Sequence, residues 1–413
     1  MDYISKSYII QVICFNLFLT FIVIIEVKYL KKILSIILVL YLIFLSFSLS
    51  ASAINEEAVE VNAKAAGLMD FSTGKVLYSF NENERLYPAS VTKIMPMLLV
   101  MEALDSGKIS LDDTVTTSTN AASKGGSQIW LKEGEEMTVD ELMKATAIGS
   151  ANDAVTALGE HLYGSEEAFV LEMNKRAEEL GMTNTNFVNG SGLDDDTTEH
   201  LTTAYDIAVM SRELLKHEKI TDYTTVWMDS LRGGETQLVN TNKLVRFYSG
   251  TTGLKTGTTS KAGNCLSASA KRDGLHLIAV VMGASSGTER FEAAKRMLNW
   301  GFSNYETVTP SVDEALLTPV RVKKGVEAYV MPRAEEIKPL TLNKGLKDKI
   351  ETEISLSDYI EAPCEENQII GKLVIKAEGE TVGEYNLLCE KPVERITFGV
   401  MFLRFLKVLS KSL

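Results

Sequence analysis

Tyr87-Pro88-Ala89-Ser90-Val91-Thr92-Lys93-Ile94-Met95 is the most informative stretch of this chain. It places a serine, Ser90, three positions before a lysine, Lys93, and just after a proline. We expect a helix from about Ser90 to Leu104, on which positions i and i+3 share a face, so that the Lys93 amine reaches the Ser90 hydroxyl. A helix amino terminus also favours negative charge that develops near Ser90. The pair therefore suits a serine nucleophile with an adjacent base.

Two later stretches give this pair a context that a chance match lacks. Serine and lysine often fall three positions apart by chance, and Ser72-Thr73-Gly74-Lys75 also fits, although we interpret it as a turn. The Ser90 stretch is followed, in order, by Ile148-Gly149-Ser150-Ala151-Asn152-Asp153-Ala154 and Gly253-Leu254-Lys255-Thr256-Gly257. Together they supply a nucleophile, a lysine, a second Ser/Asn pair and a cation beside a glycine, which are the groups that acyl transfer through a serine ester uses.

Lys93 must be neutral to accept the serine proton, whereas a free lysine has a pKa near ~10.4. Burial and a second cation both lower the pKa of a lysine, and Lys255 is the candidate second cation. Ser150 suits passing a proton to a leaving amine, and Asn152 suits holding a substrate amide. Taken alone, this Ser/Asn pair is more typical of a helix-capping loop.

The last stretch suggests contacts with a substrate. Gly257 lets a peptide lie close against the edge of a strand and extend the sheet. The Thr256 hydroxyl, together with a nearby arginine, suits binding of a carboxylate. The backbone N–H groups of Ser90 and Thr258 are the candidate oxyanion hole.

Apolar periodicity predicts an α+β fold with a sheet and a helical subdomain. The first strands are expected within Ala65–Tyr78, and a mostly helical region follows them. In that region Thr138 opens a capping box, and Ser165 caps a helix whose Phe169 and Met173 share one face. The later strands, and the helix over them, are expected at Gly253–Thr258, Asn264–Ala270, Leu275–Met282 and Glu289–Trp300. Pro96 removes a backbone donor and predicts a kink in the Ser90 helix.

Four segments follow from these patterns. We place an apolar leader with a secretory signal at 1–53, the catalytic domain at 54–305, a small all-β domain at 306–390 and an amphipathic helix at 391–413. The small β domain is predicted from short alternating strands. Its glycine-containing turns are expected at Gly325, Gly371, Gly379 and Gly383.

Two apolar runs, Ile9–Ile25 and Ile33–Leu49, precede the globular part of the chain. The second follows basic residues and ends at Ala51-Ser52-Ala53, which is the pattern of a secretory signal, so the exported protein is expected to begin near Ile54. An uncleaved anchor is the alternative, because this apolar run is long for a signal. The first is either a transmembrane helix or sequence upstream of a true start at Val27, and we favour the second interpretation. Under either interpretation, the protein is expected to leave the cytoplasm.

The terminal segment has the pattern of a basic amphipathic helix, which favours binding to a membrane surface. Its apolar residues at helical spacing are Phe398, Phe402, Phe405 and Leu409. The cations on another side are Arg404, Lys407 and Lys411.

Composition excludes several classes of function. The net charge of −13 argues against binding to nucleic acid. The four histidines form no HExxH pattern and the four cysteines form no CxxC pair, so we expect no metal and no cofactor.

Two further expectations concern local structure. Cys364 and Cys389 are expected to stay unpaired. Asp194-Asp195-Asp196 is interpreted as a solvated loop.

Residues from about Ala63 to Phe302 resemble the low-molecular-mass penicillin-binding proteins, the D-alanyl-D-alanine carboxypeptidases that trim cell-wall pentapeptides. The three quoted stretches carry the resemblance, and Thr202-Thr203-Ala204-Tyr205-Asp206 and Trp300-Gly301-Phe302 support it. The resemblance implies that the sheet is antiparallel and flanked by helices. It implies that the protein removes the terminal D-alanine of peptidoglycan stem peptides and is acylated by β-lactam antibiotics. It also implies a location at the outer face of the cytoplasmic membrane or in the cell wall.

The resemblance implies roles for individual residues as well. Ser90 would be the nucleophile and Lys93 the base, and the assisting residues would be Ser150, Asn152 and Lys255. Arg290 would help Thr256 to bind the terminal carboxylate. Ala151 departs from the family, which usually has glycine between the Ser and Asn of this motif, and Pro96 interrupts a helix that the family normally continues.

Two other functions compete with this interpretation. A class A β-lactamase needs a carboxylate that activates the deacylating water, and between Ser150 and Lys255 no glutamate has the Leu-Asn context of such enzymes. Glu199 is the only glutamate near His200, and its context differs. An inactive peptidoglycan-binding protein is the alternative from a different class, but all the reacting groups are present in this chain.

Overall fold

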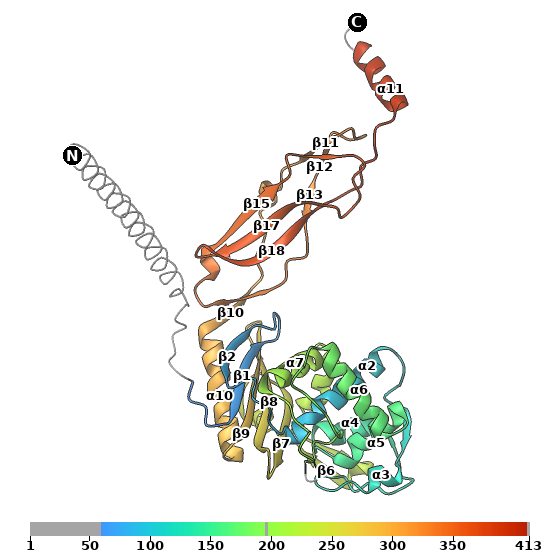
Figure 1. The fold of residues 1–413 in the computed structure, drawn as a ribbon, viewed down its shortest axis with the longest axis vertical. Coiled ribbons are helices and arrows are strands. Elements are labelled where there is room, and N and C mark those ends of the chain that lie inside the picture. Colours follow the sequence, from blue (N-terminus) through green and yellow to red (C-terminus); the bar gives the residue numbers. More distant parts are fainter. Residues whose placement is uncertain (1–58, 195–196, 411–413) are drawn as a thin grey trace, which may run out of the picture. The chain divides into compact units, whose positions relative to one another are not determined.

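The computed structural model describes residues 59–194 and 197–410 (Figure 1). The predicted leader, the secretory signal and the start near Ile54 lie outside the described residues, as do Asp195, Asp196 and Lys411. All elements described below belong to one compact unit, Glu60–Leu413. No helix of the described segments is both long enough and apolar enough to cross a membrane.

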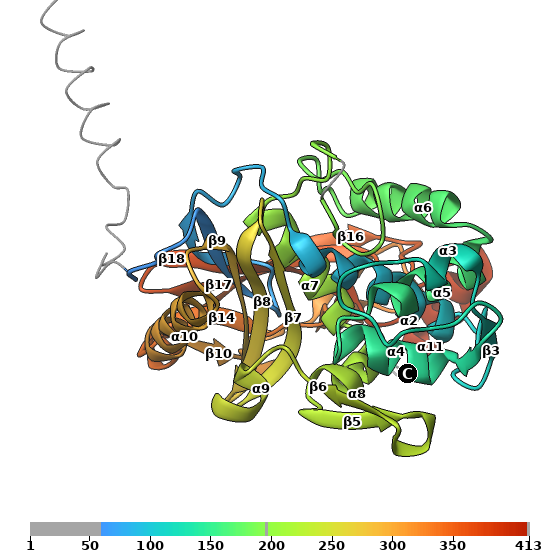
Figure 2. The same ribbon diagram turned by 90° about the horizontal axis from the view of Figure 1, so that it is seen from below.

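A five-stranded antiparallel sheet with the order β2-β1-β9-β8-β7 supports the site. Its strands are β1 (Ala65–Asp70), β2 (Val76–Phe80), β7 (Thr251–Thr259), β8 (Gly263–Arg272) and β9 (Leu275–Ala284). Nearly all of β9 is buried because α10 (Gly287–Asn304) packs on one face of the sheet and α7 (Ala204–Leu215) on the other (Figure 2). The predicted strands and the helix over them are confirmed, and β7 is an edge strand of the sheet.

The helical region lies beside β7 (Figure 2). Its helices are α2 (Ile94–Asp105), α3 (Thr119–Ala122), α4 (Val139–Ala147), α5 (Asn152–Tyr163), α6 (Glu166–Glu179), α8 (Thr221–Thr224) and α9 (Leu244–Phe247). Two small hairpins accompany them, β3 (Thr114–Thr116) with β4 (Glu136–Thr138) and β5 (Met228–Leu231) with β6 (Thr236–Val239). The capping box at Thr138 and the Ser165 cap are both present, and Phe169 and Met173 are buried as predicted.

Pro96 does not interrupt a helix, which corrects the predicted kink. Residues Ala89–Lys93 form a separate 3₁₀ helix, η1, and α2 begins only at Ile94. Pro96 is therefore the third residue of α2, in the first turn, where a backbone N–H has no partner within the helix. The proline costs no hydrogen bond at that position.

After α10, the chain forms short strands arranged in small sheets. These are β10 (Tyr305–Val308), β11 (Val320–Lys323), β12 (Tyr329–Val330), β13 (Pro332–Ala334), β14 (Leu340–Asn343), β15 (Ile350–Leu356), β16 (Tyr359–Glu361), β17 (Ile369–Ala377) and β18 (Glu380–Cys389). Gly379 lies in the β17–β18 turn with φ +84°, as predicted. Gly371 and Gly383 lie inside strands, next to shifts of register, so the predicted turns there are wrong.

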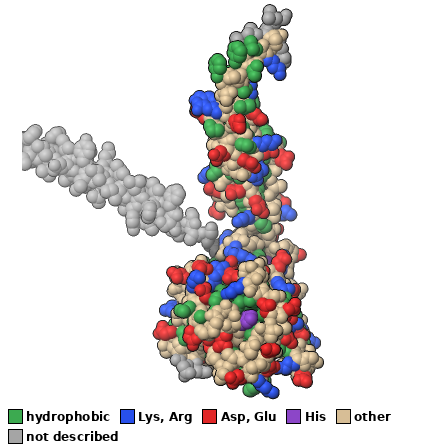
Figure 3. Space-filling model, turned by 90° about the vertical axis from the view of Figure 1, so that its right-hand side faces the viewer, with side chains coloured by type: hydrophobic (Ala, Val, Ile, Leu, Met, Phe, Trp, Pro, Cys, Tyr) green, Lys and Arg blue, Asp and Glu red, His purple; other side chains and the backbone are tan. Residues whose placement is uncertain are grey.

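The Cys364 and Cys389 thiols are free, with their sulfur atoms 3.0 Å apart. In the terminal segment, the helix α11 spans Phe398–Leu409. Apolar side chains are visible on its surface at the top of Figure 3.

Gly159 tests how tightly α5 packs on α6. A Cβ at this position would lie 2.0 Å from a ring carbon of Phe169. Gly→Ala in a helix normally stabilises by about 1 kcal/mol, but overpacking a core costs about 1–3 kcal/mol. We expect Gly159→Ala to lower the free energy of unfolding in urea, whereas Gly399→Ala, where a Cβ meets nothing within 4 Å, has no such cost. A stabilised Gly159→Ala variant would contradict this packing.

Candidate active site

The structure brings the three sequence stretches together from different elements. Ser90 lies on η1, Ser150 lies in the break between α4 and α5, and Lys255 lies on β7. The amine of Lys93 is 3.1 Å from Ser90 Oγ, and the amine of Lys255 is 2.8 Å from Ser150 Oγ. The site therefore holds two serine–lysine pairs. Ser72, the other candidate, lies in the turn between β1 and β2.

The backbone beside both serines is strained. Ala89, directly before Ser90, has φ +49°, and Ser150 itself has φ +62°. Residues other than glycine rarely adopt these angles, and each costs about 1–3 kcal/mol. Such strain persists only where the surrounding structure fixes it, and it fixes the direction in which each serine points.

The Lys93 amine is completely buried and has three oxygen neighbours. It lies 3.1 Å from Ser90 Oγ, 2.6 Å from Asn152 Oδ1 and 2.7 Å from the Ser191 carbonyl oxygen. The last two oxygens can only accept hydrogen bonds. A neutral amine has two N–H groups for them, and its lone pair is then left for the Ser90 hydroxyl, which can donate.

Electrostatics favours this neutral form. Burial lowers the pKa of Lys93 well below its ordinary value, and the nearby charge of Lys255 lowers it further, while Asp153 acts in the opposite direction. Burial, followed by the charge of Arg290, also lowers the pKa of Lys255, to about 7. Burial and a neighbouring cation, the two causes expected from the sequence, therefore both lower the pKa of Lys93 in the structure.

Asn152 has a different environment from the one expected. Its Oδ1 accepts from Lys93, and its Nδ2 donates to the Gly125 carbonyl over 2.7 Å. Its backbone N–H donates to the Ser127 carbonyl, also over 2.7 Å. The side chain thus joins the lysine to the 125–131 loop. Its contacts fit a residue that positions Lys93 better than one that holds a substrate amide.

Gly257 is required for a reason that the sequence argument missed. A Cβ there would lie 2.8 Å from the Pro88 carbonyl oxygen and from the Ser90 nitrogen. Only glycine therefore lets β7 approach the start of η1 so closely. This approach brings the backbone of Thr258, the next residue on β7, near that of Ser90, as an oxyanion hole formed by their two N–H groups requires.

Of the other predicted substrate-binding residues, Thr256 and Thr258 lie on β7 and Arg290 lies on α10. The Thr256 hydroxyl donates to Thr241 Oγ1 over 2.7 Å. Arg290, on α10, donates to the Gly257 carbonyl over 3.0 Å and to Thr258 Oγ1 over 2.9 Å, and its buried Nε has no hydrogen-bond partner among the described residues. Its guanidinium also donates to the Cys265 carbonyl over 3.3 Å, and none of these three hydrogen bonds goes to Thr256.

Sequence reasoning missed two buried residues beside the site. Asp153 follows Asn152 directly and accepts the backbone N–H groups of Ile129 and Leu131. His200 was not among the predicted site residues. Its Nδ1 accepts from Val188, so its Nε2 carries the proton and donates to Thr92 Oγ1 over 2.8 Å. Burial lowers the pKa of His200 to about 4, which keeps it neutral.

The interpretation of Asp194 as part of a solvated loop is wrong. Asp194 is buried, its carboxylate accepts from Thr259 over 2.6 Å, and its carbonyl accepts from Lys261. These bonds join the 189–194 segment, which carries Ser191, to the turn after β7. A run of three acidic residues gave no sign that the first of them points inward.

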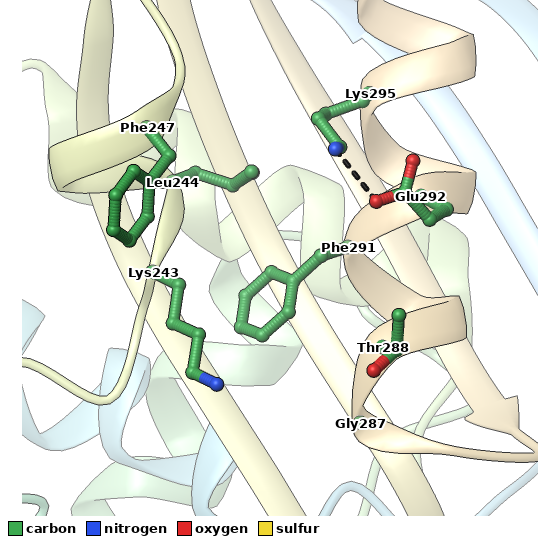
Figure 4. A pocket seen from close by; sticks show the side chains of 8 residues that line it. All are labelled: Lys243, Leu244, Phe247, Gly287, Thr288, Phe291, Glu292 and Lys295. Carbon is green, nitrogen blue, oxygen red and sulfur yellow. Dashed lines mark ion pairs between the residues drawn. The ribbon is translucent and has the colours of Figure 1, made fainter.

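A pocket of about 290 Å³ lies away from these reacting groups, between α9 and α10 (Figure 4). Phe247 and Phe291 face it from the two helices, and Lys295 forms an ion pair with Glu292 over 2.6 Å. None of the predicted site residues lines it. The chemistry therefore belongs to the junction of η1, β7 and the α4–α5 break.

This fold, with two serine–lysine pairs at the edge of an antiparallel sheet, defines a serine-type acyl-transfer enzyme. A family model described as D-alanyl-D-alanine carboxypeptidase matches residues 51–286, and one described as the C-terminal domain of penicillin-binding protein 5 matches residues 305–395. The chain belongs to the D-alanyl-D-alanine carboxypeptidase family of penicillin-binding serine peptidases. Its expected ligands are peptidoglycan stem peptides and β-lactams, as this family implies.

Similar proteins agree with this membership. D-alanyl-D-alanine carboxypeptidase DacF of Bacillus subtilis is 44% identical over 382 residues, which cover 91% of this chain and 97% of that protein. The crystal structure of penicillin-binding protein 5 from Haemophilus influenzae matches with a TM-score of 0.73 and 31% identity, over 81% of this chain and 98% of that one. Penicillin-binding protein D2 from Listeria monocytogenes, in its ampicillin-bound form, matches with a TM-score of 0.54 and 31% identity, over 59% of this chain and 98% of that one. The predicted family, fold class and enzyme class are confirmed.

The charge of Lys255 should set the pH at which Lys93 becomes neutral. Since that charge lowers the pKa of Lys93, Lys255→Ala should raise this pKa and move the rising limb of the pH–rate profile to higher pH. Lys255→Arg keeps the charge and should leave the limb in place. The measurement is the rate of acylation by benzylpenicillin from pH 5 to 10. An unshifted limb in Lys255→Ala would show that the two lysines are not coupled.

Proposed function

We propose that the protein removes the terminal D-alanine from peptidoglycan stem pentapeptides through an acyl-enzyme on Ser90. The observation that carries this proposal is the buried Lys93 amine, with two neighbours that only accept hydrogen bonds and Ser90 Oγ as the third. No other described serine that begins an SxxK pattern has this environment, since Ser72 lies in a turn.

In the acylation step, neutral Lys93 takes the proton of Ser90 as Oγ attacks the carbonyl carbon of the penultimate D-alanine. The N–H groups of Ser90 and Thr258 stabilise the oxyanion. The peptide bond then breaks as Ser150 passes its proton to the departing amine and regains one from Lys93, which becomes neutral again. Lys255, 2.8 Å away, donates a hydrogen bond to Ser150 Oγ during this transfer. Water later attacks the ester and gives a proton to Lys93, and Lys93 returns that proton to Ser90 Oγ as the ester bond breaks.

Binding of the terminal carboxylate is proposed for the Thr256 side of β7. The Thr256 hydroxyl and the Lys255 cation supply hydrogen bonds and charge. Arg290 adds positive charge from α10 and holds the strand through the Gly257 carbonyl and Thr258 Oγ1. Gly257 keeps the strand edge close to Ser90, where the substrate extends the sheet.

Mapping the penicillin adduct tests the nucleophile. After treatment with benzylpenicillin and proteolysis, mass spectrometry should find the adduct on the Ser90 peptide, and Ser90→Ala should abolish it while leaving the melting temperature nearly unchanged. Ser72→Ala is the matched control and should keep the adduct. An adduct on Ser72 would contradict the proposal. Rapid loss of the adduct from Ser90 would instead favour a β-lactamase.

We further propose that the protein is exported and that α11 holds it at the outer face of the cytoplasmic membrane. Phe398, Phe402 and Leu403 are at least half exposed, and the Phe398 and Phe402 rings stack 6.3 Å apart. Exposed apolar side chains on a helix with Arg404 and Lys407 suit the boundary between acyl chains and headgroups. The side chains of Phe405 and Leu409, expected on the same face, lie outside the described residues.

Co-sedimentation with vesicles tests this tether. The chain from Ile54 onward, which lacks the apolar leader, should bind anionic vesicles more strongly than neutral ones, because each cation near the surface adds about 1 kcal/mol. The same chain ending at Thr397 should lose this binding. This end point keeps Val393 and Ile396, whose backbones bond to Cys364 and Lys324. Equal binding by the two chains would reject the tether.

A further inference from the structure

Trp130 is the most unusual side chain beside the site. It is 74% exposed, whereas its neighbours Ile129 and Leu131 are only 3% and 4% exposed. Its backbone has φ +60°, which is strained for a bulky residue. None of the ring contacts recorded in segments 59–194 and 197–410 involves its indole. Packing of the Trp130 side chain therefore does not compensate for the strain of its backbone.

The backbone around Trp130 is nevertheless firmly held. The buried Asp153 carboxylate accepts the N–H groups on both sides, those of Ile129 at 3.1 Å and Leu131 at 3.0 Å. Arg232 donates to the Ile129 carbonyl over 2.9 Å and forms an ion pair with Glu135 over 2.7 Å. The loop is thus built to hold one large apolar side chain in solvent, which is the pattern of strain stored at a functional position.

The same loop is attached to the reacting groups. Asn152, which binds Lys93, also donates to the carbonyls of Gly125 and Ser127. Asp153, which fixes the backbone of Trp130, is the next residue. Trp130 therefore lies on a loop that is held by Asn152, which contacts the catalytic lysine, and by the adjacent Asp153.

We propose that Trp130 is a specificity-determining residue that binds the stem peptide upstream of its two terminal D-alanines, through the side chain of the diamino acid that precedes them. This inference rests on the proposed substrate. The indole face packs against the methylene chain of the diamino acid and attracts its ammonium group by a cation–π interaction. A large rigid aromatic that is already exposed and fixed loses little entropy when it binds.

The test compares substrates that reach Trp130 with substrates that do not. For the pentapeptide L-Ala-D-isoGlu-L-Lys-D-Ala-D-Ala, Trp130→Ala should lower kcat/KM about tenfold, the loss typical of truncating an aromatic anchor, and Trp130→Phe should retain most of the activity. Cleavage of N-acetyl-D-Ala-D-Ala and acylation by benzylpenicillin should change less than about twofold in both variants. Leu171→Ala, another highly exposed apolar residue, is the matched control and should change neither rate.

Thermal unfolding provides a second readout. Trp130→Gly should unfold at a higher temperature than Trp130→Ala, since glycine adopts φ +60° without strain, and it should show the same selective loss on the pentapeptide. Equal losses on both substrates, or no loss on the pentapeptide, would overturn the role of Trp130. If the parent enzyme cleaved neither peptide and formed no Ser90 adduct, the proposed function itself would fail.

Discussion

A lysine amine taken out of water beside a serine hydroxyl is the constraint on which this site depends. Lys93 is fully buried, and the structure places three oxygens around its nitrogen. An ammonium group in this position would lose its hydration, so the neutral form is favoured and the pKa falls. The neutral amine is the form that can take a proton from Ser90.

Each part of the fold supplies one element of this environment. The η1 helix places Ser90 and Lys93 on one face, the break before α5 brings in Asn152, and the 189–194 segment contributes the Ser191 carbonyl. The edge strand β7 brings Lys255 close enough to act on Lys93. Gly257 makes this possible, because any larger residue would collide with the backbone before Ser90.

The residues that bear the chemistry were predictable because chemistry restricts residue type and spacing. The Ser90–Lys93 spacing gives a shared helical face whether the turn is 3₁₀ or α, so the pair was found although the helix type was not. The kink at Pro96 was mispredicted because sequence did not show that α2 begins at Ile94. The inward position of Asp194 and the bonding of Asn152 to Lys93 and Gly125 depend on distant segments, which local patterns do not contain. Gly371 was mistaken for a turn because a glycine beside a strand bulge has the same local signal.

The protonation state of Lys93 is the most direct test of this account. Lysines labelled with ¹³C at Cε can be titrated by NMR, with Lys93→Arg identifying the Lys93 signal and Lys255→Arg identifying its neighbour. We expect the Lys93 signal to titrate far below the ordinary lysine value, because the amine is buried and lies near the charge of Lys255. A Lys93 signal that titrates near ~10.4, the value of a free lysine, would contradict the account.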